Sequence, residues 1–223
     1  MQRIHRLLAF AVGSALALSA PADAQIATFG YTNSIVTWTV PTTGSYFIEA
    51  LGAQGGSGGQ FEGGLGAQIG GQFSFTAGDA LRLAVGGKGE SSSGYGGGNG
   101  GGGGGSFVVD WFGNALLIAG GGGGIAAFAD QNGCDASTGE YGIAGAGNTP
   151  TSPCSPKTGS LGQGGAAGAG SSGSGGAGFY SNGADDPGYG TGGEDWANEL
   201  HGGVQYGSCV DAASGGFGGG GAG

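Results

Sequence analysis

Runs of consecutive glycine constrain this chain more than any other feature of its sequence. Residues 100–124 read GGGGGGSFVVDWFGNALLIAGGGGG, so an apolar, hairpin-like segment stands between runs of six and five glycines. Glycine loses more conformational entropy on folding than any other residue. The runs are therefore either flexible linkers or segments ordered in a conformation that only glycine permits.

Three stretches show the alternation of apolar and polar residues that predicts β-hairpins. They cover residues 34–50, 69–85 and 107–118, each with a short turn near its middle. The third is almost continuously apolar, which is typical of strands covered on both faces. After residue 24 no segment keeps a helical apolar period. The sequence predicts one all-β domain over 25–223 with very little α-helix, in which strands dominate 25–90 and glycine runs with short strands and loops dominate 91–223.

The composition argues against a simple linker. Glycine makes up 63 of the 223 residues, yet the chain also contains 11 Phe, 7 Tyr and 3 Trp. Flexible linkers are rich in Gly and Ser and do not need aromatic side chains. The glycines lack the strict Gly-X-Y period of collagen, which excludes a collagen triple helix. Two interpretations stay open: an ordered glycine lattice held by strands, or a small β domain with a flexible glycine tail.

Residues 1–24 have the pattern of a secretory signal peptide. Two arginines precede an apolar stretch at 7–20, and Ala-Asp-Ala at 22–24 forms a small-x-small cleavage site, so Gln25 is the expected mature N-terminus. The apolar stretch is short for a bilayer span. The pattern predicts a secreted or cell-surface protein without membrane insertion after cleavage, and the Ala-rich core is typical of bacteria.

The charge balance is acidic. The formal net charge is −10, from 5 basic and 15 acidic side chains. Nucleic acids and anionic surfaces are bound by clustered Lys and Arg. After residue 24 the only basic side chains are Arg82, Lys88 and Lys157. We therefore expect no nucleic-acid partner.

Export permits disulfide bonds, and the chain contains three cysteines. Cys134 and Cys154 would close a loop of about 20 residues, and the bridge would stabilise the fold by about 3 kcal/mol. We expect this pair to be bonded. Cys209 would then be unpaired or bonded elsewhere, because sequence alone does not settle connectivity.

Several motifs, taken in order, resemble one known family. Residues 34–59 read SIVTWTVPTTGSYFIEALGAQGGSGG, residues 76–89 read TAGDALRLAVGGKG, and the stretch 100–124 is followed by GAGFYSNG, GGEDWANELHGG and GGFGGGG. They are similar to the glycine-rich domain family best known from the extracellular regions of the anaplastic lymphoma kinase and leukocyte tyrosine kinase receptors. The resemblance covers residues 28–223 and includes no kinase domain.

The resemblance implies a jelly-roll-like β-sandwich with an inserted bundle of polyglycine-II-type extended helices. This is physically plausible, because such a helix has three residues per turn and no internal hydrogen bonds. Its N–H and C=O groups point sideways and need partners when they are buried. Without Cβ atoms, neighbouring helices can approach closely enough to pair those groups.

No motif for catalysis or cofactor binding is complete. His201 is the only histidine after the predicted signal peptide, which leaves no pair for a zinc site. The sequence around Gly87-Lys88 departs at two positions from a phosphate-binding loop. Two carboxylate pairs, Asp185-Asp186 and Glu194-Asp195, are predicted to be solvated turn residues. We expect neither an enzyme nor a cofactor.

The segment 130–140, DQNGCDASTGE, is the closest approach to a metal site. It carries four side chains with oxygen ligands, but glycine at its fourth position and cysteine at its fifth break the spacing of an EF-hand. A disulfide-anchored surface loop is the favoured interpretation, and calcium binding is the alternative. The calcium candidates are Asp130, Asn132, Asp135 and Glu140.

Aromatic side chains in Gly/Ser/Asn-rich loops are a more promising functional surface, because rigid rings are good binding anchors. Phe179 and Trp196 are expected to be structural and to cover the sandwich. The candidate ligand contacts are Tyr95, Tyr180 and Tyr189. The leading hypothesis is a non-catalytic binding module for an extracellular protein or glycan. The alternative is a self-associating matrix, coat or adhesin component whose rigid lattice is its function.

Overall fold

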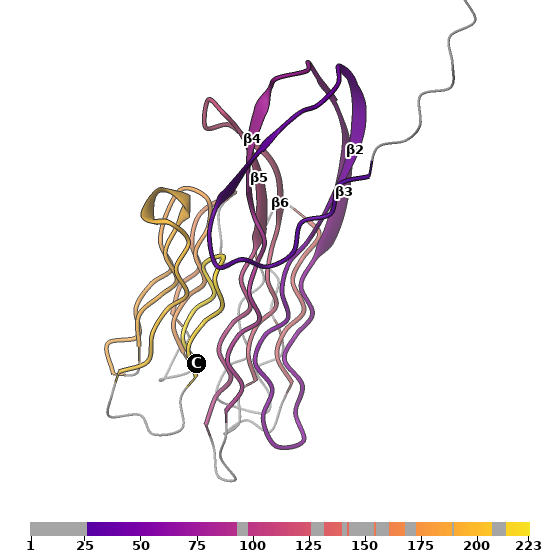
Figure 1. Ribbon diagram of the computed structural model, residues 1–223. Coiled ribbons are helices and arrows are strands. Elements are labelled where there is room, and N and C mark those ends of the chain that lie inside the picture. The colour runs from indigo at the N-terminus through magenta and orange to yellow at the C-terminus, as the bar shows by residue number, and fades with distance from the viewer. Residues whose placement is uncertain are drawn as a thin grey trace, which may run out of the picture.

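Six strands form two antiparallel sheets in the part of the chain that the structure describes (Figure 1). This computed structural model describes residues 26–92, 98–125, 132–139, 142, 154, 161–167, 173–188, 190–206 and 213–223. The predicted signal peptide lies outside these residues. The strands are β1 (Val36–Thr39), β2 (Gly44–Leu51), β3 (Gln68–Phe75), β4 (Ala80–Ala84), β5 (Ser106–Asp110) and β6 (Ala115–Ala119).

The described residues contain no α-helix and one short 3-10 turn, η2 (Trp196–Asn198). No helix in this part of the chain is long and apolar enough to cross a membrane. The prediction of a nearly all-β chain is confirmed.

Strand pairing differs from the predicted hairpins in two of three cases. The four-stranded sheet has the order β1-β4-β5-β6, and the second sheet pairs β2 with β3. Only β5 and β6 form a predicted hairpin, whereas the turns after β1 and β3 carry the chain from one sheet to the other. Alternation predicts which face of a strand is buried but does not identify its neighbour. Those two hairpin predictions are therefore wrong.

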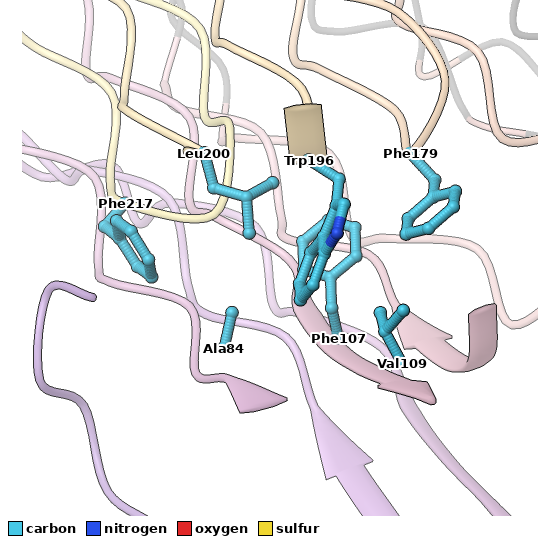
Figure 2. Close-up of a cluster of buried hydrophobic side chains, with 7 residues drawn as sticks. All are labelled: Ala84, Phe107, Val109, Phe179, Trp196, Leu200 and Phe217. Carbon is cyan, nitrogen blue, oxygen red and sulfur yellow. The ribbon is translucent and has the colours of Figure 1, made fainter. Parts of the chain in front are cut away.

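Both faces of the four-stranded sheet carry an apolar cluster, although Thr37 and Thr39 of β1 stay exposed. One face contacts the β2–β3 sheet through a shared apolar cluster that includes Leu81, Leu83 and Val108 opposite Ile48 and Phe75. The other face is covered by side chains from later, glycine-rich segments (Figure 2). This second cluster contains Ala84, Phe107, Val109, Phe179, Trp196, Leu200 and Phe217. The near-continuous apolar pattern of 107–118 is explained by this double coverage, most fully in β5.

The glycine-rich segments extend from the sheets as two groups of wavy chains, one indigo to salmon and one orange to yellow (Figure 1). The run 100–105 lies where the groups meet, and all six of its N–H groups donate to other segments. The N–H groups of its first and fourth residues donate to carbonyl oxygens in 122–125. Those of its second and fifth residues donate to 87–90, and those of its third and sixth residues donate to 218–221. All six bonds are 2.8–3.1 Å long. The donors thus point in three directions with a period of three residues. Every amide of this run is therefore paired, which favours the ordered lattice over the flexible tail for these glycines.

Side-chain atoms have no room inside this arrangement. A Cβ at Gly103 would overlap the carbonyl oxygen of Ala53 and lie 2.6 Å from that of Gln54. A real Cβ does not approach a backbone oxygen so closely, so a side chain there would push the segments apart. Close approach, rather than a turn, is what requires glycine at this position.

Candidate binding surfaces

The predicted disulfide between Cys134 and Cys154 is present, with the two Cα atoms 5.5 Å apart. Cys134 is buried, and its carbonyl oxygen accepts a hydrogen bond from Gly123 at 2.8 Å. The bridge therefore anchors a segment that is itself part of the glycine bundle. Cys209 lies outside the described residues.

Two of the four calcium candidates have structural contacts. The side-chain oxygen of Asn132 accepts from the N–H of Glu62 at 2.9 Å, and that of Asp135 accepts from Leu65 at 2.7 Å. Asp130 and Glu140 lie outside the described residues. Among the residues that are described, no three acidic, histidine or cysteine side chains are placed to hold a metal ion. Calcium binding by the full set stays a prediction.

The same kind of contact recurs elsewhere in the glycine bundle. Oxygen atoms of polar side chains accept from backbone N–H groups that donate to no carbonyl of the described residues. We call six of these acceptors the capping side chains, and their bonds are 2.7–2.9 Å long. They are Asn132, Asp135, Ser181, Asn182, Asp185 and Thr191.

Tyr180 is the one predicted ligand contact that falls within the described residues, since Tyr95 and Tyr189 do not. Its side chain is 65% exposed, and its ring meets the ring of Phe179 edge to face at 5.0 Å. The ring also covers Gly162, whose φ of +68° and lack of room exclude a side chain. Tyr180 is therefore exposed but held, and its role in binding stays a prediction.

Phe179 and Trp196 are buried, as expected for structural residues. Figure 2 shows both beside Phe107 of β5, and the ring centroids of Trp196 and Phe107 lie 5.9 Å apart. The guanidinium of Arg82 lies 5.1 Å from the centre of the Trp196 ring, within reach of a cation–π interaction. The prediction that these aromatics cover the strands is confirmed.

Sequence reasoning missed an aromatic pair at the tip of the β5–β6 hairpin. Trp111 is 62% exposed and Phe112 is 89% exposed. The turn beneath them is held by Asp110, whose carboxylate accepts from the backbone and the side chain of Asn114, both at 2.8 Å. These bonds hold the pKa of Asp110 below its usual 3.8. The signal was available, because two large aromatics before Gly-Asn in a predicted hairpin turn have no strand face to cover.

A groove of about 650 Å³ lies between three neighbouring segments of the second glycine group, at 182–185, 191–194 and 201–204. Backbone bonds hold the segments together: Thr191 donates to Val204 at 2.9 Å, and Glu194 donates to His201 at 2.8 Å. The groove is lined by Asn182, Gly183, Asp185, Thr191, Gly192, Glu194, His201, Gly202 and Val204.

One ion pair lies at this groove. Nδ1 of His201 is 2.7 Å from Oε2 of Glu194, and both side chains are about half exposed. The hydrogen bond that the Glu194 carboxylate accepts, assisted by its negative charge, raises the pKa of His201 above the usual 6.5. The sequence alone did not indicate Glu194 as a partner of His201, because the two residues are seven positions apart in a segment with no helical period.

The carboxylate pairs are not simply solvated, which corrects the prediction. Asp186 and Asp195 are each only 7% exposed. Asp195 accepts from the N–H of Asn198 at 3.1 Å and so caps η2. Asp185, in contrast, faces the groove, where one of its oxygen atoms accepts from Gly192 at 2.8 Å. The alternation of buried and exposed carboxylates arises because neighbouring residues of an extended segment point to different sides.

No protein-family model matches this chain, and no curated protein is significantly similar to it. The resemblance to the glycine-rich receptor domains stays a prediction that rests on the order of the motifs. Proposals about function therefore rest on the tip, on Tyr180 and on the groove.

Proposed function

We propose that the protein is a secreted or cell-surface, non-catalytic binding module that recognises an extracellular protein or glycan. The observation that carries this proposal is the exposed pair Trp111 and Phe112 on a turn held by Asp110. Large aromatic side chains have few rotatable bonds, so they lose little entropy when they bind from a turn that is already held, which makes them effective anchors. Tyr180 supplies a second exposed ring on a fixed backbone.

The scaffold of this module is proposed to be a jelly-roll-like β-sandwich with a bundle of polyglycine-II-type helices. The apolar cluster between the two sheets supports the sandwich. The three-residue period of the hydrogen bonds from 100–105 supports the helices, because polyproline-II-type chains have three residues per turn. Both features are those that the resemblance to the receptor domain family implies.

Export is proposed from the signal-peptide pattern and from the disulfide. Disulfides persist mainly in oxidising compartments outside the cytosol, and the Cys134–Cys154 bridge is consistent with one. The net charge of −10 argues against nucleic acid as the partner.

A structural role in a matrix, coat or adhesin is the alternative, and the exposed Phe47 and Leu51 on β2 favour it. Three of the capping side chains, Asn132, Asp135 and Thr191, argue against growth of the lattice. They occupy N–H groups of the exposed residues Glu62, Leu65 and Val204, to which another glycine chain could otherwise bind. Exposed, unpaired backbone edges are what allow extended chains to assemble, and proteins that stay monomeric block them. The binding module is therefore the better supported proposal.

Two measurements separate these functions. Sedimentation velocity on the chain from Gln25 is expected to show a monomer at every concentration, whereas concentration-dependent oligomers would favour the structural role. Arrays of extracellular proteins and glycans are then probed with the wild type and with the variant Trp111→Ala/Phe112→Ala. Phe47→Ala is the control, because Phe47 is also an exposed aromatic residue. The proposal is supported if the control still binds the ligand and the tip variant does not. Equal binding by all three proteins would remove the tip from it.

A further inference from the structure

We propose that the groove between 182–185, 191–194 and 201–204 binds a neutral saccharide through its hydroxyl groups. This inference rests on the proposed binding function and names a ligand class for a second surface, apart from the aromatic tip. It is carried by the shape of the groove, by the polar atoms that the fold leaves available there, and by their charge.

The shape is formed before any ligand binds. Gly183 donates to Gly193 at 2.9 Å, and further backbone bonds join the other two segments, so the walls belong to one hydrogen-bonded array. A volume of about 650 Å³ falls within the range of about 300–1,000 Å³ typical of small-molecule sites. A ligand would therefore meet a groove that needs no ordering, which lowers the entropy lost on binding.

Two side chains in the groove are oriented as donors. Asn182 accepts through Oδ1 from the N–H of Asp195 and from the side chain of Asn198. These bonds fix the amide, and no hydrogen bond between described residues uses its NH₂ group. Thr191 accepts through Oγ1 from the N–H of Val204 at 2.9 Å. Its hydroxyl hydrogen is thus directed elsewhere and can donate to a ligand.

Two carboxylates in the groove are oriented as acceptors. One oxygen of Asp185 accepts from Gly192, and one oxygen of Glu194 is bonded to His201. A carboxylate has lone pairs for about four hydrogen bonds, so each keeps most of its accepting capacity. Donors and acceptors therefore line the same groove.

This mixture of groups selects the ligand class. Asp185 and Glu194 disfavour an anion, and an apolar ligand would leave the polar atoms without partners, which is costly once water is displaced. Where His201 is protonated, its charge partly offsets the carboxylates, which weakens the attraction for a cation. Each sugar hydroxyl both donates and accepts and so matches donors and acceptors alike. The half-exposed Val204 offers apolar contact to the C–H face of a sugar ring.

The test is an ¹⁵N NMR titration of the chain from Gln25 with cellotriose, maltotriose, chitotriose and mannotriose. We expect at least one trisaccharide to shift the amide signals of Gly183, Gly192 and Gly202 while those of the hairpin tip stay in place. Asp185→Asn, which keeps an oxygen for Gly192, and Glu194→Gln are each expected to weaken binding about tenfold, a loss typical of one charge-assisted hydrogen bond. Glu199→Gln removes a nearby exposed charge outside the lining and should leave the affinity unchanged.

Three outcomes would overturn the inference. In the first, no trisaccharide shifts the amide signals of the groove. In the second, all three variants weaken binding equally. In the third, calcium chloride or a sulfated trisaccharide shifts the groove amides and the neutral sugars do not. If the trisaccharides fail while a ligand still binds through Trp111 and Phe112, the saccharide inference falls and the proposed function stands. If the protein binds no sugar and self-associates, both fall.

Discussion

Gly103 donates its N–H to the carbonyl oxygen of Gly122 at 2.8 Å, and these residues belong to the two glycine runs on either side of the β5–β6 hairpin. The hairpin places Ser106 opposite Ala119, so the runs leave the sheet side by side. Each such hydrogen bond stabilises the fold by about 1 kcal/mol. Ordering a glycine costs roughly 0.5–1 kcal/mol more conformational entropy than ordering an alanine, so the two contributions nearly cancel. The lattice is therefore favourable only when nearly every amide is paired.

Amide hydrogen exchange checks this pairing. We expect the amides of 100–105 to be protected from exchange as strongly as those of β5 and β6, because all six donate to backbone oxygens. The measurement is exchange by NMR or mass spectrometry on the chain from Gln25. Complete exchange of 100–105 within the dead time would mean that the glycines are a flexible tail.

Replacing one lattice glycine should destabilise the fold. In Gly103→Ala the added methyl overlaps the carbonyl oxygen of Ala53, and we expect a loss of about 1–3 kcal/mol or more in the free energy of unfolding. Denaturant unfolding measures it. Gly44→Ala is the matched control, because its Cβ would meet nothing within 4 Å. Equal effects of the two substitutions would contradict the packed lattice.

The pair of His201 with Glu194 should make stability depend on pH near neutrality. The pKa of His201 is raised above 6.5 in the folded protein, so the pair stabilises the fold fully below pH 6.5 and this contribution is lost as the pH rises through the raised pKa. An NMR titration of the imidazole in the wild type and in Glu194→Gln is the measurement. We expect the substitution to lower the pKa toward 6.5, and an unchanged pKa would show that Glu194 is not the cause.

The turn beneath the aromatic tip should respond to Asn114→Ala. Hydrogen bonds from Asn114 lower the pKa of Asp110, so their removal should raise it toward 3.8. In the wild type this interaction stabilises the fold above pH 3.8 and is lost as the pH falls through the lowered pKa. A carboxyl NMR titration gives both values, and Gln72→Ala on β3 serves as the control. If the pKa of Asp110 is the same in Asn114→Ala as in Gln72→Ala, the hydrogen bonds from Asn114 do not hold the turn.

Loss of the disulfide should lower stability by about 3 kcal/mol, the estimate for a loop of this length. The variant Cys134→Ser/Cys154→Ser tests this in thermal and denaturant unfolding, with Cys209→Ser as the control. We also expect faster amide exchange at Gly123, which donates to the backbone of Cys134. Equal stability of the double variant and the control would show that the bridge adds nothing to the folded lattice.

Several features could be predicted from residue types alone. Alternating apolar residues mark the strands, and the pairing expected for Cys134 and Cys154 is the one present. Phe179 and Trp196 could be expected in the interior because they stand within motifs that resemble the glycine-rich receptor domains, and both are buried. These signals are local, since they depend on what each side chain prefers.

Only the tertiary structure decides the neighbours. Strands β1 and β2 have similar alternating patterns, so their placement in different sheets depends on the cluster between the sheets rather than on either pattern. Asp186 and Asp195 are buried through the segments around them, which residue type alone does not reveal. The clearest case is the glycine runs. A glycine has no side chain to distinguish it from the next glycine, so the sequence alone determines only that the segments can approach closely. The strands and loops position the ends of each run, and they decide which amide donates to which carbonyl oxygen.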